Sequence, residues 1–447
     1  MQDKEANKVS LLIKNIISVG FVQIANYILP LVSVPIIVRI IGPNNFGVIN
    51  YFTAFTAYFV LLINYGFDYT GTRYIAVQKD NIFLRNEHFS KILYAKIFLF
   101  VVSTILFLSI IFFVAKTSDE LKIAFYTFLI CISGVLSPNW FYQGMQNLTS
   151  IAIFNLCAKL IYTVIILFIV NKKTDYVWQP LALSVTQILI AIVSLILAVR
   201  KYDISIVKIK FSVVSKLLWD DKLIFLTMIA SNLYTDTNVV ILGLYETKEN
   251  IGYFTAAWKL TFIFLMIISF PLSQALFPYI AEAFSQNVEK GIKQVKRMLP
   301  IIIYFTLLCS FIMFFLGDLL IRLFYGPQFI PSVLIFKILM FVPVLSYINT
   351  ILGLQTMVNL KMDKPYFFII FLGGVFSVVF NVIIINIYGY KGCAWSWVVT
   401  EIIIALVSHF YLKKKDINLF DSSYFSYNSV LNELRLLIKK IYPKQVN

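Results

Sequence analysis

Residues 92–115 read ILYAKIFLFVVSTILFLSIIFFVA, an unbroken apolar stretch whose only charged residue is Lys96. As a helix this stretch would rise about 36 Å, at about 1.5 Å per residue, which is enough to cross about 30 Å of hydrocarbon. Lipid offers no water to backbone N–H and C=O groups, so a spanning segment must satisfy them within its own helix. The stretch therefore predicts a transmembrane helix.

Similar stretches lie on both sides of this one. The predicted spans cover residues 11–38, 46–70, 92–115, 121–141, 149–170, 177–199, 221–243, 251–279, 299–316, 331–357, 364–386 and 393–412. Hydrophobic residues make up 60% of the chain and charged residues 13%, with a mean hydropathy of +0.84, which excludes a soluble domain. The four cysteines fall inside predicted spans without a CxxC pair, so we expect neither a disulfide framework nor a metal site.

The basic residues predict the orientation of the chain. With both termini in the cytoplasm, the cytoplasmic loops and tails carry 26 lysines and arginines and the opposite side carries 8. Cytoplasmic loops are enriched in these residues, so both termini are expected inside. The net charge of +16 mainly reflects this topology. No compact basic domain exists that would bind nucleic acid.

Two fragments of the first half recur in the second. Residues 46–47 and 51–54 (FG, YFTA) resemble residues 251–256 (IGYFTA), and residues 143–148 (QGMQNL) resemble residues 355–360 (QTMVNL). The offsets of about 205 and 212 residues indicate a duplication of six spans, which would form parallel repeats with a substrate path between them. Chance similarity between apolar helices is the alternative. The repeat predicts one six-helix bundle over residues 1–202 and a second over residues 203–415.

The remaining residues, 416–447, form a predicted cytoplasmic tail. Apolar residues recur in it at helical spacing, from Val430 to Ile441, with arginine and lysine between them. This pattern favours a short amphipathic helix on the anionic inner surface of the membrane.

Four basic residues lie within the predicted spans. A charge at the centre of a spanning helix costs about 2.5–3.5 kcal/mol on the insertion scale, so it usually faces a cavity or a partner. Lys159 is the deepest, roughly 15 Å from either end of its span. Lys259 and Lys337 lie closer to span ends and are further cavity candidates, although each could reach the membrane surface. Lys96, near the cytoplasmic end of its span, is expected at the surface.

Uncharged polar and acidic residues supply the other candidates. The predicted cavity residues are Gln23, Asn26, Asn64 and Asn232, and the candidates for ion coupling are Asp68, Asp236 and Glu401. Several of these share one helix face, such as Asn64 with Asp68 and Asn232 with Asp236, and lipid cannot face such a stripe. We expect an aqueous cleft shared by spans 1, 2, 7 and 8. Hydrogen bonding between helices is the alternative for the stripes, and a structural ion pair is the alternative for Glu401.

Motifs for catalysis or nucleotide binding are missing from the sequence. It contains no GxxxxGK[ST] loop and no HExxH motif, and its two histidines, His88 and His409, form no acid–base constellation. We therefore expect neither an enzyme nor a cofactor, and any transport would draw on a gradient or on consumption of the product.

Several motifs carry a family resemblance. They are Tyr27-Ile28-Leu29-Pro30, Pro35, Arg39, Gly42-Pro43, Phe46-Gly47, Tyr65-Gly66-Phe67-Asp68, Gly71-Thr72-Arg73, Ala76 and Trp140-Phe141-Tyr142-Gln143-Gly144. Together they resemble Wzx-type polysaccharide flippases of the multidrug, oligosaccharidyl-lipid and polysaccharide exporter (MOP) superfamily. Arg73 joins the candidate cavity residues.

The resemblance implies two six-helix bundles in the bacterial inner membrane. It also implies translocation of an undecaprenyl-diphosphate-linked oligosaccharide to the outer leaflet, in contact with membrane lipid and with the polymerase and chain-length proteins of the pathway as possible partners. The same fold hosts cation-coupled drug exporters and the flippase of the peptidoglycan precursor, and both remain alternatives.

Overall fold

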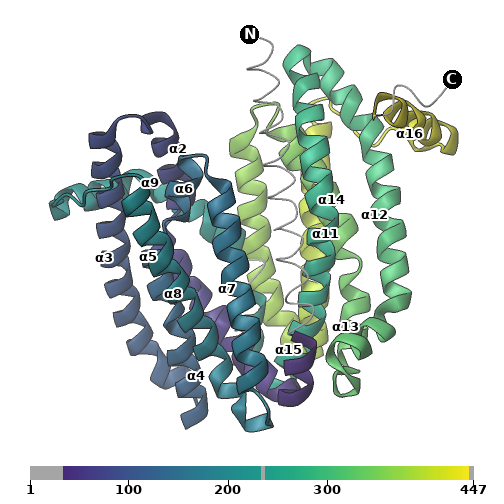
Figure 1. The fold of residues 1–447 in the computed structure, drawn as a ribbon. Coiled ribbons are helices and arrows are strands. Elements are labelled where there is room, and N and C mark those ends of the chain that lie inside the picture. Colours follow the sequence, from purple (N-terminus) through teal and green to yellow (C-terminus); the bar gives the residue numbers. More distant parts are fainter. Residues whose placement is uncertain (1–33, 233–236, 442–447) are drawn as a thin grey trace. The chain divides into compact units, whose positions relative to one another are not determined.

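The structure is a computed structural model that describes residues 34–232 and 237–441, and these residues form helices joined by turns and loops, without a strand (Figure 1). After a helix at 34–64, the main helices are α2 (Phe67–Gln78), α3 (Ile82–Val114), α4 (Ser118–Phe128), α5 (Ile130–Leu136), α6 (Asn139–Gly144), α7 (Leu148–Ile169), α8 (Trp178–Lys201), α9 (Phe211–Asn232), α10 (Thr237–Tyr245), α11 (Lys248–Gln286), α12 (Val288–Tyr325), α13 (Ser332–Leu339), α14 (Val342–Thr350), the π-helix η3 (Ile351–Met357), α15 (Asp363–Lys413) and α16 (Tyr427–Ile441). The predicted all-α class is confirmed.

Nine segments of the described residues are long and apolar enough to cross a membrane. They correspond to ten of the twelve predicted spans, because α15 contains both span 11 and span 12. Most of predicted span 1 lies outside the described residues, and predicted span 7 includes residues 233–236, which are also outside them. The total of twelve and the orientation of the termini therefore stay predictions.

Three of the breaks between helices lie at a glycine or a proline. Those at Gly66 and Pro138 fall inside predicted spans, and the one at Gly389 falls between predicted spans 11 and 12. Gly66, with a φ of 87°, separates the helix at 34–64 from α2, and Gly389, with a φ of 60°, divides α15. Both glycines adopt a left-handed φ that a residue with a Cβ rarely takes. The third break lies at Pro138, between α5 and α6, where the ring nitrogen has no hydrogen to donate.

The chain forms two compact units. The first comprises residues up to Ile229, with Thr247–Gly252 and Leu323–Gln328, and the second comprises the remainder. In the first unit α8 packs against α4, α5 and α7, and in the second α15 packs against α10, α13 and α14. Large apolar side chains such as Phe113 and Phe168 are exposed on α3 and α7. Such a surface suits contact with lipid.

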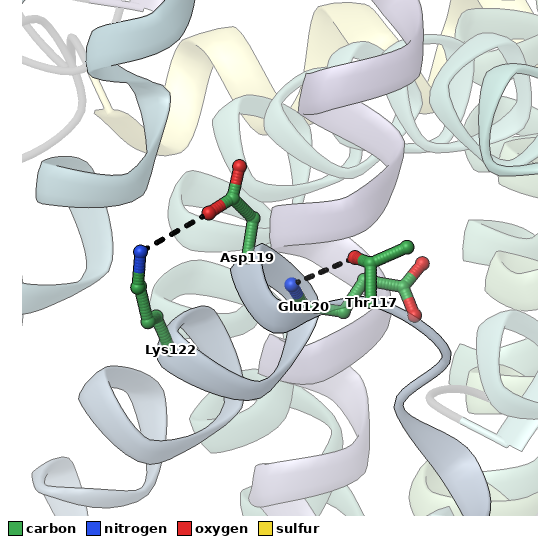
Figure 2. A network of polar contacts seen from close by, with 4 residues as sticks. All are labelled: Thr117, Asp119, Glu120 and Lys122. Atoms are coloured by element: carbon green, nitrogen blue, oxygen red, sulfur yellow. Dashed lines mark hydrogen bonds and ion pairs between the residues drawn. The ribbon is translucent and has the colours of Figure 1, made fainter.

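Side-chain hydrogen bonds cap the start of α4, and Figure 2 shows the one from Glu120 to Thr117. The hydroxyl oxygen of Thr117 accepts a hydrogen bond from the backbone N–H of Glu120 at 3.2 Å, and the Glu120 carboxylate accepts one from the N–H of Lys116 at 2.7 Å. The sequence Thr117-x-x-Glu120 is the pattern that satisfies free N–H groups at a helix start. Asp119 and Lys122 form an exposed ion pair at 3.3 Å on the same turn.

Gly47 and Gly252, which occupy equivalent places in the predicted repeat, lie close together within the first unit. A Cβ on Gly47 would stand 1.6 Å from the carbonyl oxygen of Lys248, and a Cβ on Gly252 would stand 2.0 Å from the carbonyl oxygen of Pro43. Each glycine thus meets the residue four positions before the other. Two backbones approach this closely only where side chains are absent.

We expect Gly47→Ala to destabilise the first unit by about 1–3 kcal/mol, because the new methyl group must displace backbone rather than a flexible side chain. Thermal unfolding in detergent would measure this effect. Gly134→Ala is the matched control, since a Cβ there would lie 3.8 Å from its nearest neighbour, an ordinary contact. Equal melting temperatures for the two variants would contradict the close crossing.

The tail forms a helix, α16, beyond a short turn at Ser422–Phe425. Two ion pairs hold the tail against α12. Lys296 pairs with Asp421, just before the turn, at 3.6 Å, and Arg297 pairs with Glu433 on α16 at 3.2 Å. The predicted helix in the tail is present, and its place on the membrane surface stays a prediction.

Candidate functional site

A polar cavity in the described part of the first unit lies where the end of α2 meets the starts of α3 and α9. Its volume is about 910 Å³. We name it the α2–α3–α9 pocket, and it is lined by Thr70, Arg73, Tyr74, Val77, Gln78, Glu87, His88, Lys91, Ser212, Val213, Lys216, Leu217, Asp220 and Asp221. In the predicted topology this end of the unit faces the cytoplasm.

The motifs behind the family resemblance position this pocket. Thr72 donates a hydrogen bond to the carbonyl oxygen of Trp140 at 3.0 Å, so α2 lies against α6. A Cβ on Gly71 would stand 2.7 Å from Ile92 and 2.8 Å from the Trp140 ring. The glycine therefore permits a close approach, which holds Arg73, two residues further along α2, at the pocket wall.

Charged groups of both signs line this pocket. Lys91 forms an ion pair with Glu87 at 2.7 Å, and the Asp221 carboxylate accepts a hydrogen bond from Thr70 at 2.8 Å. Arg73 and Lys216 are exposed, with no ion pair shown in the described residues. Guanidinium and ammonium groups are the side chains that bind phosphate oxygens.

An aromatic pair forms another part of the wall. The rings of Tyr74 and His88 stack with centroids 3.8 Å apart. The pocket thus offers a flat ring surface beside cationic groups, which could bind a ligand with a phosphate and a less polar or sugar portion.

The second cavity lies inside the first unit and has a volume of about 220 Å³. We name it the inner cavity, and it is lined by Val60, Asn64, Asp68, Lys96, Ile130, Ser133, Gly134, Ser137, Asn139, Phe154, Asn155, Gln187, Ile190, Ala191 and Ser194. Lys96 donates hydrogen bonds to the side-chain oxygen of Asn64 at 3.2 Å and to the carbonyl oxygen of Gly134 at 3.0 Å.

The expectation that Lys96 lies at the surface is wrong, because its side chain is only 3% exposed. The predicted span began at residue 92, but α3 begins at Ile82, so Lys96 lies four turns into the helix. Asn64 and Asp68 both line this cavity, although the break at Gly66 places them on two different helices and not on one helix face. The cavity is enclosed by elements of the first unit alone.

A buried carboxylate with neutral hydrogen-bond donors around it lies in the second unit. Glu401 on α15 is 6% exposed and accepts hydrogen bonds from Ser346 at 2.7 Å, from the side chain of Asn349 at 2.6 Å and from the indole of Trp397 at 3.3 Å. Ser346 and Asn349 belong to α14, so the carboxylate joins two helices. No ion pair to Glu401 occurs in the described chain, and the contacts shown are hydrogen bonds from neutral groups.

The three deep lysines are distributed over both units. Lys159 lies half-buried in the middle of α7 in the first unit, and Lys259 and Lys337 lie half-buried on α11 and α13 in the second. The Lys337 ammonium lies 5.3 Å from the centre of the Phe314 ring. None of the three lines either cavity of the first unit.

The remaining candidates are only partly described. Gln23, Asn26 and Asp236 lie outside the described residues. Asn232 ends α9, and its carbonyl oxygen accepts a hydrogen bond from Thr237 at 3.1 Å. Lys91 and Lys216 were not among the predicted site residues. Lysines next to predicted spans on the cytoplasmic side are expected from the orientation of the chain alone, so they do not indicate a binding site.

Comparison with known proteins shows the family. A sequence model described as "Polysaccharide biosynthesis protein" matches residues 12–284. Two relatives are each named "Putative O-antigen transporter". The one from Escherichia coli (strain K12) is 25% identical, covering 89% of this chain and 95% of the relative. The one from Shigella dysenteriae is 26% identical, covering 88% and 98%.

Solved structures share the fold. "Lipid II flippase MurJ, inward closed conformation" has a TM-score of 0.68 at 16% identity, covering 96% of this chain and 94% of that one. An inward-facing multidrug resistance MATE family transporter of the MOP superfamily has a TM-score of 0.71 at 15% identity, covering 87% and 94%. The chain therefore belongs to the polysaccharide biosynthesis protein family, in agreement with its resemblance to Wzx-type polysaccharide flippases, and it is a multi-pass protein of the bacterial inner membrane.

Proposed function

We propose that the protein is a flippase, without enzymatic activity, that carries undecaprenyl-diphosphate-linked oligosaccharide repeat units from the cytoplasmic to the outer leaflet by alternating access. The observation that carries the proposal is the end-to-end similarity to proteins named as O-antigen transporters. It is supported by the α2–α3–α9 pocket, where cations and a ring surface lie together. A diphosphate joined to sugars has the matching chemistry.

The test is complementation of bacteria that lack their own repeat-unit flippase. Cells that carry this protein are expected to restore surface glycan and to lose the lipid-linked repeat units that accumulate on the cytoplasmic side. A panel of host strains with different repeat units is needed, because the sugar is unknown. Failure in every host, together with lower drug accumulation in cells, would instead favour the multidrug exporter.

Arg73 gives a sharper test of the pocket. We expect Arg73→Ala to reduce glycan export about tenfold or more, because loss of a charge-assisted hydrogen bond to phosphate costs about 1.5–3 kcal/mol. Arg73→Lys should retain part of the export, since an ammonium keeps the charge without the two-pronged geometry. Surface glycan per unit of membrane protein is the measurement.

The matched control is Arg200→Ala, which removes an exposed arginine at the end of α8 that does not line the pocket. Equal export by both alanine variants would remove Arg73 from cargo binding.

A further inference from the structure

The inner cavity contains one cation and one carboxylate. Among the residues that line it, only Lys96 and Asp68 carry charge. A volume of about 220 Å³ leaves room for several water molecules, each of which takes about 30 Å³ in the liquid. A charged cavity within a spanning bundle is costly unless its charges balance, so the two groups must be considered together.

The ammonium of Lys96 occupies two oxygen atoms that could bind a small cation. One is the side-chain oxygen of Asn64, and the other is the carbonyl oxygen of Gly134. The Gly134 carbonyl is available because the residue four positions later is Pro138, which has no N–H to donate to it. Neutral oxygens of this kind, from amides and broken helices, are typical ligands of small hard cations.

Asp68 supplies the balancing charge without direct contact. It lies in the first turn of α2, just beyond the break at Gly66, and it lines the same cavity as Lys96. The described residues show no ion pair between the two side chains, although both line the same cavity. The Lys96 ammonium is thus held by two neutral oxygens, with the Asp68 carboxylate in the same cavity. A small bound cation would be held in the same way.

We propose that the inner cavity is a binding site for a small monovalent cation and that the ammonium of Lys96 fills it as a tethered ion. The first unit then needs no free metal ion at this place, since the chain itself provides the charge that balances Asp68. Removing the Lys96 side chain should open a vacant site of the right chemistry for a primary ammonium ion.

The experiment is chemical rescue of purified full-length protein in detergent. Lys96→Ala leaves two partly buried oxygens without a donor and Asp68 without a counter-charge, so its melting temperature should fall by about 5–10 °C. Methylammonium or ethylammonium chloride should restore most of this loss in a saturable way, because a ligand that binds the folded state stabilises it by mass action. Tetramethylammonium chloride at equal concentration should not, since it has no N–H to donate.

Two further variants test whether the rescue by primary ammonium ions is specific to this cavity. In Lys96→Ala with Asp68→Asn, primary ammonium ions should no longer raise the melting temperature. Lys122→Ala is the matched control, because Lys122 forms an exposed ion pair with Asp119, and neither a large loss nor a rescue is expected. Equal responses to methylammonium and tetramethylammonium, or no response to either, would overturn the proposal.

A second measurement covers the case in which Lys96→Ala does not accumulate. Lys96→Met keeps the length of the side chain but leaves Asp68 unbalanced, so adding Asp68→Asn should raise the melting temperature of Lys96→Met. A further fall on adding Asp68→Asn would show that Lys96 does not balance Asp68, and the proposal would be wrong. All of these measurements use no cargo, so they are independent of whether the protein transports a glycan.

Discussion

Lys159→Ala is expected to abolish glycan export while the amount of protein in the membrane stays normal. Lys159 lies eleven residues after the start of α7 and ten before its end, so roughly 15 Å of helix separates it from either side. A lysine at that depth is costly unless it meets a cavity, a partner or the cargo. A diphosphate that crosses the membrane is a cargo whose charge such an ammonium can balance.

The variants at Lys159 separate charge from size. Lys159→Arg should retain part of the export, because the positive charge remains, whereas Lys159→Met should lose it, because only the length remains. Lys259→Ala and Lys337→Ala should show milder losses. Surface glycan in a flippase-null strain is the measurement, with Lys122→Ala as the exposed control. Full complementation by Lys159→Ala would remove Lys159 from the mechanism, and loss of the protein from the membrane would assign it to folding.

The class of the fold could be predicted because the constraint behind it is local. Each spanning helix must be long and apolar by itself, so hydropathy identifies it without knowledge of its neighbours. Ten of the twelve predicted spans are therefore recovered as helices in the described residues. The break at Gly66 could not be placed, because glycine occurs in spanning helices both with and without a break, whereas Gly389 lies between predicted spans 11 and 12.

The inner cavity was predicted only in part. The spacing of Asn64 and Asp68 predicts one shared polar helix face, whereas the break at Gly66 places the two residues on different helices that both line the cavity. Lys96 was misjudged because α3 starts ten residues earlier than the apolar stretch does, and its first turns are polar. One signal was present in the sequence: Pro138 must leave a carbonyl free four residues earlier, and a buried donor has to satisfy it.

Glu401→Ala is expected to lower the stability of the second unit by more than about 3 kcal/mol. The substitution removes the acceptor of the half-buried Ser346 hydroxyl and of the buried Trp397 indole, and it leaves the buried Asn349 amide only its bond to the backbone carbonyl oxygen of residue 401. Each buried donor that loses its partner costs roughly 1–3 kcal/mol. Because these contacts join α14 to α15, the loss should appear as a lower melting temperature in detergent.

Glu401→Gln separates structure from ion coupling. The side-chain oxygen of Asn349 has no partner in the described residues, so rotation of that amide would let it accept from the new amide. We therefore expect Glu401→Gln to melt close to the wild-type protein and to export glycan. Asp318→Ala, which breaks only an exposed ion pair with Arg322, is the control for loss of an acidic group. A Glu401→Gln protein that melts normally but no longer exports would instead assign this carboxylate to ion coupling, because only its charge and its exchangeable proton would have been removed.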